Sequence, residues 1–268
     1  MRGVSAEGRA ESVARVEQAA AEHDAAALGS ELFAVADLLG REASLRRALT
    51  DPSAQTEAKD RLVRTVFAGR LNDPTIDVVA TAASSRWSSA GDSVDTVEHL
   101  AALSLVIESE KNGQLEELED ELFRFGRVVS GDPQLRDAMT NKAVPLGHRQ
   151  ALVRGLIEAK VSPPAVTLAV HALASRHRSV EAALEEYQKV AADRQERLVA
   201  LVRSAIELTA DQRDRLAAAL AEQYGRNIHL NLLVDPDVLG GIRVELGDDV
   251  IDGTVASRLD DARRRIAG

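Results

Sequence analysis

The stretch ELFAVADLLGREASLRRALT at residues 31–50 returns in altered form as ELFRFGRVVSGDPQLRDAMT at residues 121–140. The correspondence extends without a gap over residues 31–89 and 121–179, with fifteen identities at a constant offset of 90. Background amino-acid frequencies give roughly one identity in fifteen positions, or about four or five by chance. The sequence therefore predicts an internal duplication. A period of this length makes each copy a small domain, not one turn of a solenoid.

Composition favours helices packed through aliphatic side chains. Of 268 residues, 45% are apolar but only 3% are aromatic, so the cores depend on Leu, Val, Ile and Ala. Zero cysteines exclude disulfides and thiolate chemistry. A formal charge of −10 disfavours a general nucleic-acid binder. The sequence contains no run of 18 apolar residues and no signal-peptide pattern in its first 21, so we expect membrane association only through a partner.

Apolar residues recur at helical spacing in both copies. The clearest stripe is Leu115, Leu118, Leu122, Phe125 and Val129, matched at the same offset by Ala25, Leu28, Leu32, Val35 and Leu39. Helix starts are predicted where a capping side chain precedes proline, at Asp73-Pro74, Asp132-Pro133 and Ser162-Pro163. Each copy is thus expected to form five or six short helices.

Residues 92–111 contain no Pro or Gly, so they predict one helix that ends the first bundle and begins the second. A helix shared in this way would make the tandem stiff. The predicted fold class is mainly α, with two tandem helical bundles and a small α/β domain. The predicted domains are 1–93, 94–196 and 197–268.

The final segment has a different pattern. Residues 198–206 are β-compatible, and a capping box at Thr209 and Gln212 predicts a helix whose apolar face includes Leu216, Ala219 and Leu220. Alternating residues predict two half-buried strands at 228–232 and 242–246, joined by a turn. Asp252 is expected to cap a last helix over 253–266.

The stretch VDPDVLGGIRV at residues 234–244, followed by Gly247-Asp248 and VIDGTV at 250–255, resembles the signature of the F-type ATP synthase delta subunit family, which includes the mitochondrial oligomycin-sensitivity-conferring protein. Residues 94–268 resemble a complete family member, and about the first 90 are extra. The signature residues that we single out are Asp235, Pro236, Leu239, Gly240, Gly241, Gly247, Asp252 and Gly253. Paired glycines permit a positive φ where a turn enters a strand, which favours a structural role over a phosphate-binding loop.

The resemblance implies a non-catalytic stator subunit of the peripheral stalk, coupling proton-driven rotation to ATP synthesis. The helical bundles would bind the alpha subunits and neighbouring beta subunits of the catalytic head, and residues 198–268 would bind the b subunit. The implied location is the cytoplasmic face of the cell membrane, peripheral and held there by partners. The extra bundle, 1–93, is expected to receive another alpha-subunit helix or to brace b.

Two other classes of function compete with this interpretation. One is an unrelated helical adaptor or scaffold protein, and the other is a hydrolase. No catalytic residue, cofactor or metal site is predicted, because the sequence lacks HExxH, GxSxG and nucleotide-binding spacings. His171 and His177 are expected to be solvated or to face a partner, and Trp87 to pack at a helix junction. The Arg263-Arg264-Arg265 run is expected at a helix C-terminus, with docking of a partner as the alternative.

Overall fold

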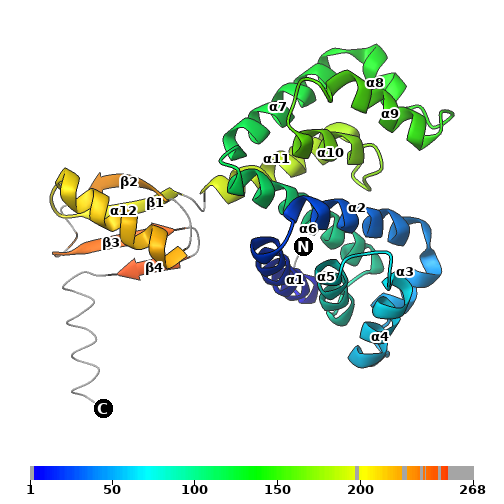
Figure 1. Cartoon of the computed structure of the whole chain (residues 1–268), viewed down its shortest axis with the longest axis horizontal. Helices are drawn as coiled ribbons and strands as arrows, with labels where there is room; N and C mark the ends of the chain where they lie inside the picture. The colour runs from blue at the N-terminus through cyan, green and yellow to red at the C-terminus, as the bar shows by residue number, and fades with distance from the viewer. Residues whose placement is uncertain are drawn as a thin grey trace. The chain divides into compact units, whose positions relative to one another are not determined.

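The structure is a computed structural model that describes residues 3–196, 199–224, 228–235, 238, 240–246 and 249–252. Its contacts divide the chain into two compact units, Met1–Ala191 and Ala192–Gly268. The first unit is built from helices and the second from a sheet and a helix (Figure 1). The predicted fold class is therefore confirmed.

The helices repeat at the offset that the sequence predicts. The first six are α1 (Val4–Glu22), α2 (Ala25–Arg41), α3 (Ala43–Thr50), α4 (Thr56–Phe67), α5 (Asp73–Ser84) and α6 (Ala90–Lys111). The next five are α7 (Leu115–Gly131), α8 (Pro133–Thr140), α9 (Leu146–Ile157), α10 (Pro163–His171) and α11 (Val180–Glu196). Both ends of α2, α3 and α4 coincide with those of α7, α8 and α9 after a shift of 90 residues.

Helix α6 belongs to both copies. Shifting α1 by 90 residues places it on α6, and shifting the start of α6 places it on the start of α11. The predicted helix over 92–111 is therefore present, slightly longer than expected. The expected boundary at 93/94 falls inside α6, and residues of both copies lie in one compact unit. Whether 1–93 and 94–196 act as separate modules stays a prediction.

The predicted apolar stripes form the core of the helical unit. Leu28, Leu32 and Val35 are at most 2% exposed, as are Leu118 and Leu122 at the equivalent positions. Burial of such side chains is worth roughly 1.5–3 kcal/mol each. Not every apolar helical residue is buried: Leu152 and Leu156 of α9 are 42% and 40% exposed.

Identical residues in the two copies make equivalent polar contacts. Glu31 accepts the backbone N–H of Asn72 at 3.1 Å, and Glu121 accepts that of Ser162 at 2.8 Å, so each carboxylate caps the start of a helix. The predicted cap at Asp73 is wrong by one residue: the N-cap of α5 is Asn72, because Glu31 supplies the capping oxygen. The caps predicted at Asp132 and Ser162 are confirmed.

A second pair of identical residues caps helix ends. Arg46 donates to the carbonyl of Leu39 at 2.6 Å and to that of Gly40 at 3.1 Å, at the end of α2. Arg136 donates to the carbonyl of Ser130 at the end of α7. Cations are favourable at this end of a helix, where backbone carbonyls lack partners.

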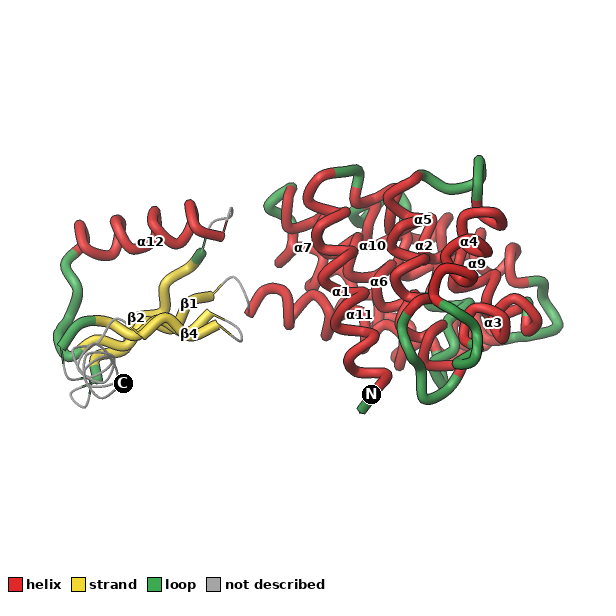
Figure 2. The backbone as a smooth tube through the Cα atoms, turned by 90° about the horizontal axis from the view of Figure 1, so that it is seen from below, coloured by secondary structure: helices red, strands yellow, loops and turns green. Residues whose placement is uncertain are grey.

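The second unit is a four-stranded sheet with α12 (Ala210–Tyr224) on one face (Figure 2). The strands are β1 (Val199–Ser204), β2 (His229–Val234), β3 (Ile242–Leu246) and β4 (Asp249–Asp252), in the order β2-β1-β3-β4. β1 pairs parallel with β2 across α12 and antiparallel with β3, placing Val202 beside Leu232 and Val244. These side chains meet Leu220 in the core.

The expected details of this unit are partly confirmed. Thr209 and Gln212 form the predicted capping box, with N···O distances of 2.9 and 3.3 Å. Ala219 is exposed, so the prediction that it lies on the apolar face of α12 was wrong. The apolar face consists of Leu216, Leu220 and Tyr224, which are spaced four residues apart. The strand β4 was missed, because two apolar residues give too little alternation. The helix expected over 253–266 lies outside the described residues.

Candidate functional site

A cluster of aromatic and titratable side chains lies where the two copies meet. Phe33 of α2 stacks on His171 at the end of α10, with ring centroids 4.2 Å apart and planes inclined by 6°. Tyr187 of α11 meets the same Phe33 ring edge-on at 6.1 Å. Such aromatic pairs contribute about 0.5–1.5 kcal/mol beyond their buried area. The junction therefore has a fixed geometry at its centre.

A cavity of about 260 Å³ borders this stack and is lined in part by Asp37, Glu98, His171 and Arg176. Burial, opposed by Arg41 and reinforced by Glu98, raises the pKa of Asp37 above its usual 3.8. Burial, and then the Glu98 charge, raises the pKa of Tyr187, which stays a phenol and donates to Glu98 Oε1 at 2.8 Å. The charge of Glu98 thus favours the neutral forms of Asp37 and Tyr187 at the junction.

His171 is half-buried and stacked on Phe33, so the expectation of a solvated side chain was wrong, and the alternative that it faces a partner stays a prediction. Burial, and secondarily the charge of Arg154, lowers its pKa from 6.5 to about 4. Its Nδ1 is buried and has no hydrogen-bond partner. The imidazole is therefore neutral near pH 7 and acts as a flat packing surface for Phe33. His177 is exposed, as expected.

Charged contacts continue the junction outward. Arg176, in the connection from α10 to α11, pairs with Asp95 of α6 at 3.0 Å. Arg9 of α1 lies 2.7 Å from the ring nitrogen of His99 and 3.9 Å from Glu186 of α11. The Arg176–Asp95 pair is exposed and the Arg9 contacts are half-buried, and an exposed ion pair is worth about 1 kcal/mol or less. Together they link the first helix of the chain to the last helix of the second copy.

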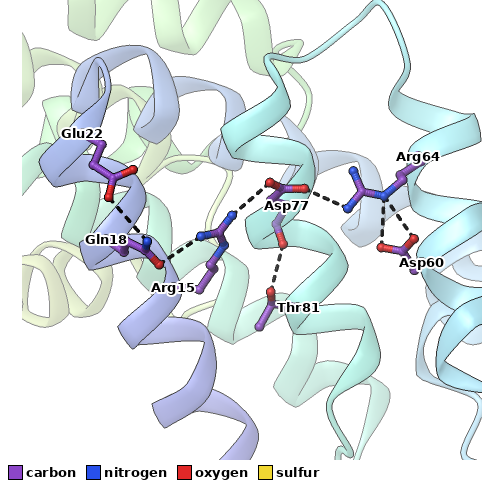
Figure 3. A network of polar contacts seen from close by, with 7 residues as sticks. All are labelled: Arg15, Gln18, Glu22, Asp60, Arg64, Asp77 and Thr81. Atoms are coloured by element: carbon purple, nitrogen blue, oxygen red, sulfur yellow. Dashed lines mark hydrogen bonds and ion pairs between the residues drawn. The ribbon is translucent and has the colours of Figure 1, made fainter.

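A separate polar network ties together α1, α4 and α5 of the first copy (Figure 3). Asp77 accepts from Arg15 at 2.9 Å and from Arg64 at 2.8 Å, and Arg64 also pairs with Asp60. A cavity of about 450 Å³ lies beside it, with Arg15, Glu22 and Asp77 among its lining residues. The second copy has Leu105 and Thr167 where the first has Arg15 and Asp77, so this network is not repeated.

Trp87 packs at a helix junction, as expected. Its indole N–H donates to the carbonyl of Ala82 at 2.9 Å, and its ring lies beside Gly8 of α1. A Cβ added at Gly8 would lie 3.4 Å from the Trp87 ring and 2.9 Å from Ser85 Cβ. The glycine therefore permits the close approach of α1 to the end of α5.

The signature segment is partly described. Asp235 donates its N–H to Ser204 and accepts from Val238 N–H at 3.1 Å, and its carboxylate lies 3.7 Å from Arg203. Gly240 and Gly241 have φ of 68° and 82°, the positive values that a turn entering β3 was expected to need. Asp252 is the last residue of β4. Pro236, Leu239, Gly247 and Gly253 lie outside the described residues, and a structural role for the signature stays a prediction.

One face of the sheet carries α12, and no other described element of the second unit lies on the opposite face. Arg203, Arg243 and Glu245 form an ion-paired row there, with Arg243 Nε 3.1 Å from Glu245 Oε1. Leu233 and Val250, on the edge strands, are 46% and 54% exposed. Within the described residues, no group of three metal-ligating side chains is found. No described helix is both long enough and apolar enough to cross a membrane.

Comparison with known proteins points to one family. A family profile described as "ATP synthase delta (OSCP) subunit" matches residues 97–266. A protein of Kineococcus radiotolerans named ATP synthase subunit delta is 48% identical over 97% of this chain and 94% of its own. The protein of that name from Thermobifida fusca is 41% identical over the full length of both chains. The one from Streptomyces griseus is 46% identical over 91% of each.

These relatives also span the first copy, which the family profile leaves out. Among solved structures, a chain of the Toxoplasma gondii mitochondrial ATP synthase hexamer matches 62% of this chain and 95% of its own at 18% identity. Its TM-score of 0.34 is too low to establish a shared fold.

Proposed function

The chain belongs to the ATP synthase delta (OSCP) subunit family, and from this premise we propose that it is the non-catalytic stator that links the alpha subunits of the catalytic head to the b subunit of the stalk. The family match over residues 97–266 carries the proposal, since it includes most of the second copy and the α/β unit. Membership of this family overturns the alternative of an unrelated adaptor and supports a structural role over a hydrolase.

The helical unit is assigned to the head, with alpha and neighbouring beta subunits as partners, and residues 198–268 to the b subunit. A stator must resist torque, so its head-binding part needs a continuous core. Helix α6 supports this assignment, because Leu100, Ala101 and Val106 are fully buried where both copies pack on one helix. A linker between the copies would bend under load, whereas a shared helix keeps them together.

The first copy is proposed to widen the connection between head and stalk, by receiving a further alpha-subunit helix or by bracing b. Its presence in relatives named ATP synthase subunit delta supports a role within the same complex. Crosslinking of the intact complex through carboxylates tests this, since Glu57 on α4 is exposed. Crosslinks from the first copy to neither alpha nor b would count against both versions.

The proposed location is the cytoplasmic face of the cell membrane, held there through partners. Co-purification of the tagged full-length chain from native membranes tests function and location together. Alpha, beta and b subunits should be recovered in constant ratio and released from the membrane only with the complex. Recovery of the chain in a soluble assembly without these subunits would refute the proposal.

A further inference from the structure

A large ring of the first copy is replaced by a smaller one in the second, and a cavity lies beside the replacement. In the first copy the indole N–H of Trp87 donates to the carbonyl of Ala82 at 2.9 Å, and its ring packs beside Gly8 of α1. The offset of 90 carries Trp87 to His177 and Gly8 to Glu98. Both His177 and Glu98 line a cavity of about 200 Å³ in the second copy. This cavity is therefore the counterpart of the place that the indole ring occupies in the first copy.

Neither replacement fills the cavity. His177 is exposed to solvent, and its backbone N–H donates to the Ser175 hydroxyl at 3.1 Å. Glu98 is only 6% exposed, and its carboxylate accepts from the Tyr187 hydroxyl at 2.8 Å, which holds it at the wall. Wall atoms that face a void lack packing contacts on that side. A ligand of matching shape would supply those contacts.

The size and the apolar part of the wall suit one planar ring. Ala102 of α6 and Val190 of α11 line the cavity and are at most 5% exposed. A protein cavity of about 150 Å³ is large enough to bind benzene. The volume of about 200 Å³ therefore has room for a bicyclic ring of the size of an indole.

The charges in the wall favour a cation. Three acids and two arginines line the cavity. Arg176 pairs with Asp95 at 3.0 Å, and Arg9 lies 3.9 Å from Glu186, so each arginine already faces an acid. Glu98 is the third acid, and it belongs to no ion pair among the described residues. The wall thus carries one carboxylate in excess of its arginines.

The contacts of these groups disfavour an anion. Arg9 also lies 2.7 Å from a ring nitrogen of His99, which must accept because an arginine only donates. Burial, and then the negative charge of Glu98, raises the pKa of the Tyr187 phenol. A further negative charge would add to this repulsion, whereas a positive charge beside Glu98 would offset it.

We propose that this cavity binds a small planar aromatic ring that carries a protonated amine. The ring takes the position equivalent to the Trp87 indole, and the amine donates a charge-assisted hydrogen bond to Glu98. The site is separate from the stator role proposed above, because the ligand should bind to the isolated chain without any other subunit.

Calorimetric titration of the full-length chain with tryptamine tests the proposal, since this probe joins an indole ring to a protonated amine. We expect saturable binding at one site per chain. His177→Trp places an indole at the cavity, as Trp87 does in the first copy, and should weaken tryptamine binding at least about tenfold. The matched control is His148→Trp, at an exposed histidine on α9 that does not line the cavity, which should bind as the parent chain does.

Glu98→Gln tests the contact with the amine. Glutamine keeps an oxygen for the Tyr187 hydroxyl and removes the negative charge. We expect the affinity for tryptamine to fall about tenfold, while indole itself, which has no amine, keeps its affinity. His177 lies at the surface, so His177→Trp remains an independent test if Glu98→Gln fails to fold.

Absence of saturable tryptamine binding to the parent chain would overturn the proposal. Equal affinities of the parent chain and His177→Trp would also overturn it, because the ligand would then bind elsewhere. An unchanged tryptamine affinity in Glu98→Gln, or an equal loss for tryptamine and indole, would contradict the contact between the amine and Glu98. The stator role is tested by co-purification with the other subunits, so either proposal can fail without the other.

Discussion

Two carboxylates that are 90 residues apart in the sequence each cap the start of a helix. Glu31 and Glu121 are identical positions of the duplication, and each reaches from the second helix of its copy to cap the fifth. Glu121 is only 6% exposed and also accepts the Ser162 hydroxyl at 2.5 Å. A buried carboxylate that accepts two hydrogen bonds leaves unpaired donors when it is removed.

Glu121→Ala should therefore lower the free energy of unfolding by about 1–3 kcal/mol. Chemical denaturation followed by circular dichroism measures this change. The matched control is Glu117→Ala, an exposed acid on the same helix, which should change stability by less than about 0.5 kcal/mol. Equal effects of the two substitutions would show that the capping contact contributes nothing.

The neutral imidazole of His171 makes stability depend on pH. Its pKa is about 4 when folded and 6.5 in the reference state, so the unfolded chain binds the proton more tightly. The stabilisation is complete above about pH 6.5 and is lost progressively as the pH falls toward 4. It amounts to at most about 3 kcal/mol.

His171→Phe keeps a ring on Phe33 and removes the titration. We expect its free energy of unfolding to fall less than that of the parent chain between pH 6.5 and 4. Urea titrations at several pH values measure the difference, and His177→Gln, at an exposed histidine, should behave as the parent. Asp37, whose pKa is raised, is common to all three proteins and cancels. If the free energies of unfolding of the parent and of His171→Phe changed in parallel with pH, the lowered pKa of His171 would be contradicted.

At the level of elements, the contact of α2 with α6 depends on a glycine. A Cβ at Gly29 would lie 2.9 Å from two atoms of Leu105 and 3.0 Å from the carbonyl of Ala101. Gly29→Ala should cost about 1–3 kcal/mol of stability, because this clash exceeds the gain in helix propensity of about 1 kcal/mol.

The control for this substitution is Gly40→Ala, near the end of the same helix, where an added Cβ meets nothing within 4 Å. It should be neutral or stabilising by up to about 1 kcal/mol. Thermal melts of both variants decide the point. A Gly29→Ala chain as stable as Gly40→Ala would mean that α2 and α6 separate at no cost.

Helices and strands were predictable where apolar residues recurred at regular spacing over the length of the element. The stripe on α7 and the alternation in β3 identified their elements correctly, and the capping box identified the start of α12. β4 has only Val250 and Ile251 as apolar residues, and it exists through pairing with β3. The cap of α5 was misplaced because its capping oxygen comes from Glu31, 41 residues earlier, which no local pattern reveals.

For the whole molecule, we expect the sharing of α6 to make the two copies one cooperative unit. A chain ending at residue 191 should unfold in a single transition, with calorimetric and van't Hoff enthalpies in agreement. A chain ending at residue 93 should fail to fold, because it lacks most of the helix on which α1 and α2 pack. Two separated transitions in the longer chain, or a folded shorter one, would refute this.

The duplication, the helical class, the shared helix and the family signature were all readable from the sequence, because each is a local pattern or a repetition of one. The junction was not. Phe33 and Phe123 are the same residue in the same local sequence, yet one ring is buried on His171 and the other is exposed. The depressed pKa of His171 and the Tyr187–Glu98 hydrogen bond likewise join residues that are distant in the chain. Only tertiary packing decides such features, because burial and pairing depend on which helices meet and not on the order of residues within them.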